Sequence, residues 1–265
     1  MSGATRLAAA LVAAWLVAAL AAPWLEAEAN RVALERILAP PSWDAPLGRD
    51  DLGRPLGARI MAGARLSLGV TLGVVLLAAS VGTVIGILAG WCGGLVDLLV
   101  VRVIDVFLAF PGILLAIALA GVLGPGIGNL VIALSVVGWV GFARLARAQT
   151  LSLRTREHVQ VARALGTPLP RLLVLHVLRL MSGPLVVEAT FALAAVIVAE
   201  AGLSFLGLGV QPPTPSWGAL IRDGTRYLLI APHVVLMPGL ALLSLVVAIN
   251  LLGDRLRDHL LAGGR

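Results

Sequence analysis

The sequence contains no lysine, a single cysteine and few charged residues for its length. Only 13% of its 265 residues are charged, whereas 59% are hydrophobic. A soluble domain carries about 25% charged residues. A chain of this size cannot hide so much apolar surface from water, so we expect a lipid bilayer to be its solvent.

These absences also exclude several kinds of site. A phosphate-binding P-loop needs a lysine, so the chain cannot be a P-loop ATPase by itself. One cysteine, Cys92, cannot form an internal disulfide. The histidines have no metal-ligand spacing, and no pairing of a nucleophile with a base is evident. We therefore expect no catalytic residue, no metal and no cofactor, and a chain that is not an enzyme.

The net charge is +6, and every lysine or arginine position in the chain is an arginine. Such a basic balance can indicate nucleic-acid binding. The high hydropathy argues against a nucleic-acid partner, and a charge difference across a membrane explains the arginines better.

Six apolar stretches approach or exceed the roughly 20 residues that a helix needs to cross a bilayer. They are Leu7 to Leu25, Leu66 to Trp91, Val103 to Leu123, Ile127 to Ala143, Gly183 to Gly209 and Val234 to Leu252. Pro111 and Pro238 predict kinks in the third and sixth stretches. The first stretch could be a cleaved signal peptide, but its length and the later spans favour a retained helix. The predicted fold is an all-α membrane protein with six transmembrane helices.

Arginines are unevenly distributed between the segments that connect these spans. With the N-terminus inside, the inner segments hold twelve arginines and five acidic residues. The outer segments hold eight arginines and seven acidic residues. The positive-inside rule therefore places both termini in the cytoplasm. We divide the chain into residues 1–65, a transmembrane helix with an extracytoplasmic segment, and residues 66–265, a five-helix core. The end of the extracytoplasmic segment is expected to form an interfacial helix.

The inner connection at residues 149–180 contains the stretch "EHVQVARALGTPLPRLL", from Glu157 to Leu173. Gly166 suits the position that ends a helix, and Thr167 and Pro168 suit the cap and first residue of a second helix. Three apolar residues are spaced to share one helix face: Val159, Ala162 and Leu165. The stretch either anchors the loop at the membrane or docks in a groove of a cytoplasmic partner.

This stretch resembles the "EAA" cytoplasmic loop of ABC-transporter permeases. Aligned on Gly166, the chain has Gln160, Val161 and Ala162 in the Glu-Ala-Ala places, and Arg179 replaces the usual proline. The resemblance implies a coupling loop that a cytoplasmic ATPase receives. The coupling residues that it implies are Gln160, Val161, Ala162, Arg163, Leu165 and Gly166.

A second stretch, "EAGLSFLGLGVQPPTPSWG" from Glu200 to Gly218, closely resembles the second (C-type) permease of the peptide and nickel branch. The segments "LGRDDLGRPLGARIMAGARLSL", "FPGILLA" and "NLLGDRLRD" fit the same subunit, so the resemblance extends from about Leu47 onward. It implies one permease half of an ATP-driven importer in a bacterial or archaeal plasma membrane. The implied partners are a second homologous permease, two ATP-binding cytoplasmic subunits and an extracytoplasmic solute-binding protein.

The cargo stays open between several classes of solute. Dipeptides or oligopeptides are the commoner cargo in this family. Nickel is an alternative because "LSLRTREHV" also resembles nickel permeases, and glutathione is another. A secondary transporter is the rival class, but such a chain would show inverted repeats and clustered intramembrane charges.

Two acids, Glu188 and Glu200, lie within the fifth span, where an ionisable residue is a functional-site hypothesis. Glu200 is a candidate for the translocation path, with a structural hydrogen bond as the alternative. Glu188 is expected near the inner interface. We also expect Trp217 to be an interfacial anchor. Three charged residues at the inner start of the third span are expected to pair locally: Asp97, Arg102 and Asp105.

Overall fold

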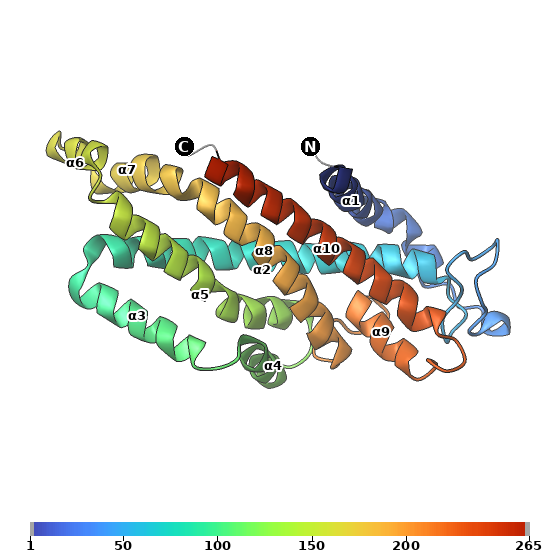
Figure 1. The fold of residues 1–265 in the computed structure, drawn as a ribbon. Helices are drawn as coiled ribbons and strands as arrows, with labels where there is room; N and C mark the ends of the chain where they lie inside the picture. Colours follow the sequence, from blue (N-terminus) through green and yellow to red (C-terminus); the bar gives the residue numbers. More distant parts are fainter. Residues whose placement is uncertain (1–2, 263–265) are drawn as a thin grey trace.

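The computed structural model describes residues 3–262 and is almost entirely helical (Figure 1). No β-strand occurs within that range, which contains only the isolated bridges Ser42–Ala45 and Arg49–Pro55. The all-α prediction is confirmed. Arg265, counted among the inner charges, lies outside the described residues. The elements are α1 (Gly3–Ala29), η1 (Leu34–Arg36), α2 (Leu56–Cys92), α3 (Gly94–Leu108), α4 (Gly112–Leu123), α5 (Ile127–Leu153), α6 (Glu157–Ala164), α7 (Leu169–Leu172), the π-helical segment η2 (Leu173–Leu178), α8 (Arg179–Phe205), α9 (Trp217–Thr225) and α10 (His233–Ala262).

Five helical segments are long and apolar enough to cross a bilayer: α1, α2, α5, the continuous segment Leu169–Phe205, and α10. The number rises to six if the bent pair α3 and α4 counts as one span. The helices lie where the sequence predicts them, but α5 and α10 continue past their predicted ends, to Leu153 and Ala262.

The third span is broken rather than kinked. The helices α3 and α4 meet at a bend of 86°. Pro111 is the N-cap of α4, and its ring disfavours the helical conformation of Phe110 before it. With 12 residues, α4 is about 18 Å long, shorter than the ~30 Å hydrocarbon core of a bilayer. The kink predicted at Pro111 is thus a complete break between two helices.

The first turns of α2 replace the expected interfacial helix. Residues from Leu56 onward continue without a break into the second span, through position 65 where the sequence suggested a boundary. With 37 residues, α2 is about 55 Å long. The end of the extracytoplasmic segment is thus helical, as predicted, but as the first turns of α2 itself.

Three glycines at every fourth position of α2 allow it to lie directly against α5. A Cβ atom added at Gly86 would meet the carbonyl oxygen of Ala143 and lie 2.8 Å from the Cβ of Ala146. Gly82 and Gly90 face the backbone of the same helix in the same way. Glycines in this spacing let membrane helices approach closely. The resulting α2–α5 contact is the most extensive between two helices of the described chain.

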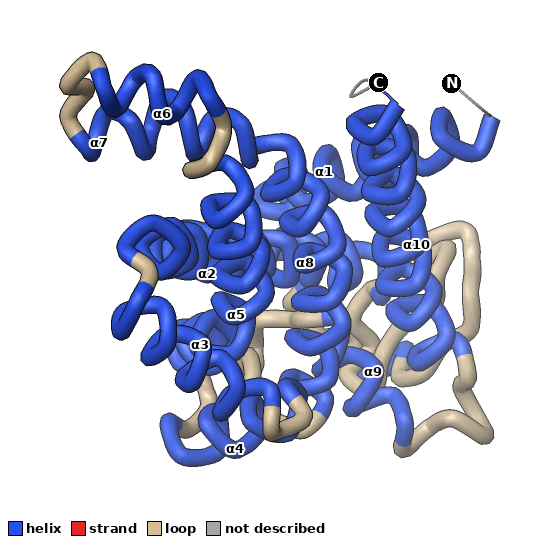
Figure 2. The backbone as a smooth tube through the Cα atoms, turned by 60° about the vertical axis from the view of Figure 1, so that its left-hand side comes forward, coloured by secondary structure: helices blue, strands red, loops and turns tan. Residues whose placement is uncertain are grey.

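The other helices pack around this pair. Helix α1 lies against α2 and α10, and α8 contacts α2, α5 and α10. Figure 2 shows α6 and α7 at the end of the molecule that also carries both ends of the described chain. Helices α4 and α9 lie at the opposite end. The loop between α5 and α8 thus shares one side with the termini.

We expect Gly86→Ala to lower the melting temperature of the detergent-purified protein. Its methyl group would force α2 and α5 apart, and overpacking of this kind costs about 1–3 kcal/mol. The matched control is Gly73→Ala in the same helix, where an added Cβ meets nothing within 4 Å. Because alanine is the better helix former, the control should keep or raise the melting temperature. Equal changes in the two variants would contradict the packing argument.

Candidate functional site

The loop between α5 and α8 contains a defined helix end at Gly166. Gly166 has φ +80°, the left-handed conformation expected of it. Its N–H donates to the carbonyl of Arg163 at 3.0 Å, and the Thr167 N–H donates to Ala162 at 3.1 Å. These two bonds form a Schellman motif that ends α6. The second helix begins one residue later than predicted, since Pro168 and not Thr167 is its N-cap.

A small apolar cluster attaches this loop to the helix bundle. Val159 of α6 is buried against residues of several helices. Its cluster contains Ile87, Ala146, Leu153, Leu172, Val177 and Met181. These residues come from α2, α5, α7, η2 and α8. Helix α6 is therefore held by the ends of the spans on both sides of it.

The six predicted coupling residues lie together on α6 and the turn that follows it. Ala162 is half-buried, whereas Gln160, Val161, Arg163, Leu165 and Gly166 are exposed. Leu165 is 81% exposed and does not share the buried face of Val159, so that part of the prediction is wrong. An exposed apolar residue at the tip of an anchored loop provides a contact surface that nothing in the described chain covers.

The ends of α2, α3 and α5 that lie nearest α6 are joined by polar contacts. Arg147 of α5 forms a two-bond ion pair with Asp97 of α3, with Nη2 2.7 Å from Oδ2. Arg154 donates from Nη1 to the carbonyl oxygen of Gly90 at 2.9 Å. The expected local pairing exists only between Arg102 and Asp105, at 3.6 Å on the surface. Asp97 takes its partner from a residue 50 positions away.

Glu200 of α8 is fully buried and hydrogen-bonded to two helices. Ser67 of α2 donates its hydroxyl to Oε2 at 2.7 Å, and Ser204 donates to Oε1 at 2.8 Å. All three side chains have no exposed surface. Ser67 and Ser204 are therefore the partners for the structural hydrogen bonding that was the alternative role of Glu200. The translocation-path role stays a prediction, and the surface of a single subunit gives it no support.

Trp217 lies in the core and not at a membrane interface. Its side chain is fully buried, and its indole N–H donates to the carbonyl oxygen of Ile60 at 2.9 Å. Its ring packs edge-on against Trp15 of α1, with centroids 5.1 Å apart. The expectation of an interfacial anchor is wrong. The stretch that resembles the permease family thus joins α1, α2, α8 and α9.

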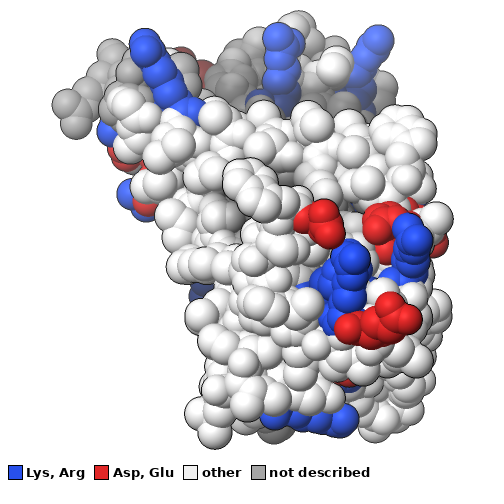
Figure 3. All heavy atoms as spheres, turned by 90° about the vertical axis from the view of Figure 1, so that its right-hand side faces the viewer, with Lys and Arg blue, Asp and Glu red and all other residues white. Residues whose placement is uncertain are grey.

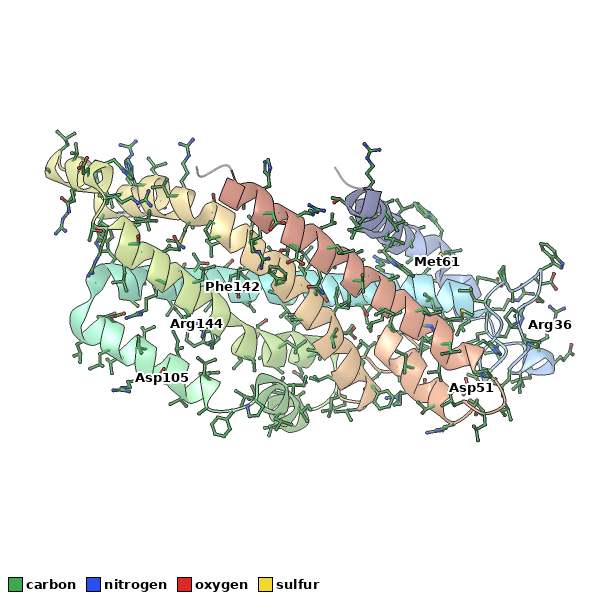
Figure 4. All side chains as sticks on the ribbon, viewed as in Figure 1. Arg36, Asp51, Met61, Asp105, Phe142 and Arg144 are labelled. Atoms are coloured by element: carbon green, nitrogen blue, oxygen red, sulfur yellow. The ribbon has the colours of Figure 1, made fainter. Side chains whose placement is uncertain are left out.

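An ion-pair cluster folds the segment between α1 and α2. Asp50 is buried and accepts from Arg54 Nε at 2.7 Å, with Arg59 Nε at 3.3 Å. Burial, assisted by the charge of Asp50, raises the pKa of Asp51. Figure 3 looks onto this end of the molecule, where basic and acidic side chains adjoin. Arg36 and Asp51 mark the same end in Figure 4. The segment between α1 and α2, residues 30–55, is therefore folded, and we call it the charged cap.

An apolar hollow of about 640 Å³ opens between α4, α8 and α10. Small side chains on α8 make most of its wall, with one polar residue contributed by α10. Its lining includes Ile113, Phe191, Ala195, Val198, Gly202 and Asn250. Glu200 is not among the lining residues.

The sequence pattern of a protein family described as "Binding-protein-dependent transport system inner membrane component" matches residues 82–263. The chain belongs to this family. It is therefore a transport permease and a multi-pass membrane protein, as the sequence predicted. The family match begins inside α2 and includes the anchored loop, the buried Glu200 and the hollow.

Individual relatives of this permease cover most of both chains. A glutathione transport system permease of Pectobacterium atrosepticum is 41% identical over 87% of this chain and 77% of its own length. A dipeptide permease of Alkalihalophilus pseudofirmus is 41% identical over 84% of this chain and 73% of its own length. A di/tripeptide permease of Pseudomonas aeruginosa is 42% identical over 84% of this chain and 76% of its own length.

A solved structure shares the permease fold. The inward-facing methionine ABC transporter MetNI contains a chain that superposes with a TM-score of 0.62 at 20% identity. The match covers 77% of this chain and 97% of that chain. The fold is thus that of an ABC importer permease.

Substitution of Glu200 distinguishes its two possible roles. Glu200→Leu would leave two buried hydroxyls without partners, each costing about 1–3 kcal/mol, and should markedly lower the melting temperature of the purified permease. Glu200→Gln can still exchange hydrogen bonds with both serines and should keep most of the stability and the transport rate. A normal melting temperature with abolished transport in Glu200→Gln would instead support the translocation-path role.

Proposed function

We propose that this permease forms one half of the translocation path of an ATP-driven importer of dipeptides or oligopeptides. The observation that carries the proposal is the 41–42% identity, over most of the chain, to permeases named for dipeptides, di/tripeptides and glutathione. These three cargoes are short peptides or peptide-like molecules. What they share is the chemistry of a peptide backbone.

ATP hydrolysis belongs to separate cytoplasmic subunits in this proposal. The absence of lysine leaves the chain without a P-loop of its own. Two ATP-binding subunits would receive the loop around Gly166 of this permease and the equivalent loop of a second permease. The exposed Val161 and Leu165 suit an apolar groove, and the neighbouring Arg163 suits acidic residues at its rim.

A second, homologous permease would cover the hollow between α4, α8 and α10. Alanine and glycine in its α8 wall leave room for a passage between two such halves. An extracytoplasmic binding protein would deliver the solute at the opposite end from α6, where the charged cap lies. With α6 and α7 in the cytoplasm, both termini are also cytoplasmic, in accord with the arginine distribution and with their common side in Figure 2.

We expect cells that lack this gene to lose uptake of a labelled dipeptide and to regain it on complementation. Labelled nickel, supplied in parallel, should enter equally with and without the gene. An excess of unlabelled dipeptide should block the gene-dependent signal. Gene-dependent nickel uptake that ignores added peptide would overturn the proposed cargo while leaving the permease assignment intact.

Gly166→Asp should abolish dipeptide uptake without preventing membrane insertion. An aspartate there meets no neighbour within 4 Å, but it strains the left-handed backbone by about 1–2 kcal/mol and places a negative charge on the coupling surface. Gly207→Asp is the matched control, since Gly207 has φ +82° and ends α8 with the same pair of backbone hydrogen bonds. A Cβ atom there would meet only the end of the flexible Arg222 side chain, at 3.3 Å. Normal uptake by Gly166→Asp, at normal protein levels in the membrane, would contradict the coupling role.

A further inference from the structure

Glu188 is on the same face of α8 as the apolar hollow. At 100° per residue, positions 188, 191, 195 and 202 fall within one 60° sector of the helix. Phe191, Ala195 and Gly202 line the hollow. The carboxylate of Glu188 is therefore one turn beyond Phe191, in line with the wall and toward the end that carries α6.

The neighbouring helix leaves room for this carboxylate. A Cβ atom added at Gly141 of α5 would lie 2.7 Å from Oε1 of Glu188. Gly141 is near the middle of α5 and one turn before Arg144. The expectation that Glu188 lies near the inner interface stays a prediction. Only a glycine at position 141 permits the observed side-chain position.

The described chain provides no partner for the Glu188 charge. Among residues 3–262 no ion pair or side-chain hydrogen bond joins its carboxylate to another group. Arg144, one turn along α5 from Gly141 and labelled in Figure 4, does not pair with it. The side chain is half-buried, and its carboxylate lies beside Gly141, one turn beyond the lining of the hollow. An intramembrane acid of this kind is costly unless a positive group meets it.

We propose that Glu188 binds the ammonium group of the solute during its passage, an inference that rests on the proposed peptide function. Every unmodified linear peptide carries an α-ammonium group, whatever its side chains. The apolar wall of Phe191, Ala195 and Gly202 tolerates varied side chains, and the single carboxylate recognises the group that they have in common. The hollow of about 640 Å³ is within the range of small-molecule sites, roughly 300–1,000 Å³.

A metal cation fits this place less well than an ammonium group. Within the described residues, no three side chains of histidine, cysteine, aspartate or glutamate gather to hold a metal ion. Asn250, the polar lining residue on α10, supplies a neutral amide. An ammonium group needs only one carboxylate and a few neutral acceptors.

The first test compares substitutions of Glu188 in complemented cells. Glu188→Gln should lower the maximal rate of labelled dipeptide uptake about tenfold or more, the loss expected for one charge-assisted hydrogen bond. The half-saturating concentration should stay unchanged, because the binding protein sets it. Glu188→Asp should recover part of the rate. Glu28→Gln, the same change at an exposed surface acid, should transport normally.

The second test restores the charge chemically within one variant. In a Cys92→Ser background, which removes the only native thiol, Glu188→Cys should transport poorly. Modification with a negatively charged methanethiosulfonate should raise uptake severalfold, and a positively charged reagent of similar size should not. Equal effects of the two reagents, or a thiol that neither reagent reaches, would overturn the proposal.

Two further measurements separate the ammonium site from a subunit contact and from a nickel permease. They are purification of the Glu188→Gln permease and uptake by the wild-type permease. The Glu188→Gln permease should retain its partner subunits and its melting temperature, with ATP hydrolysis still stimulated by the binding protein. Loss of the second permease would instead assign Glu188 to a subunit contact and overturn the ammonium site. A wild-type gene that supports nickel uptake alone would refute the peptide function itself, whatever the Glu188 variants do.

Discussion

The close approach of α2 and α5 is the contact on which the other helices depend. Between membrane helices the hydrophobic effect gives little attraction, so packing and polar contacts must hold them together. The absence of side chains at Gly82, Gly86 and Gly90 lets the two backbones meet. At the end of this pair nearest α6, Arg154 donates to the Gly90 carbonyl, and α3 is attached through the ion pair of Asp97 and Arg147. Helix α8 then packs on both members of the pair.

Polar groups inside the membrane are arranged in two different ways in this permease. Glu200 accepts a serine hydroxyl at each carboxylate oxygen, so its side chain joins α2 to α8. Glu188, twelve residues earlier on the same helix, has space beside Gly141 and no bonding partner in the described chain. The same residue type is thus structural in one place and available in the other. The difference lies in whether the neighbouring helix offers hydroxyls or a glycine.

The sequence predicted most of what depends on local composition. The spans follow from runs of about 20 apolar residues, and the end of α6 follows from the conformational freedom of Gly166. Contacts between distant segments were not predictable in this way. The partner of Asp97 is 50 residues away, and the buried place of Trp217 depends on Ile60 and Trp15. The glycine spacing in α2 was visible in the sequence, but its partner helix was not. A kink was expected at Pro111, but the 86° angle was not, because a proline alone does not set the bend angle.

The length of α2 has a mechanical consequence. One unbroken helix of 37 residues, Leu56–Cys92, contains both Ile60 and Gly90. The Ile60 carbonyl accepts from Trp217 near the charged cap, and the Gly90 carbonyl accepts from Arg154 near α6. A rigid helix of this length can carry a movement at one end of the molecule to the other end. A tilt of about 10° around its midpoint would move the two ends of this ~55 Å rod by roughly 5 Å each, in opposite directions. Narrowing at one face of the membrane would then be accompanied by widening at the other, without any change in the helix itself.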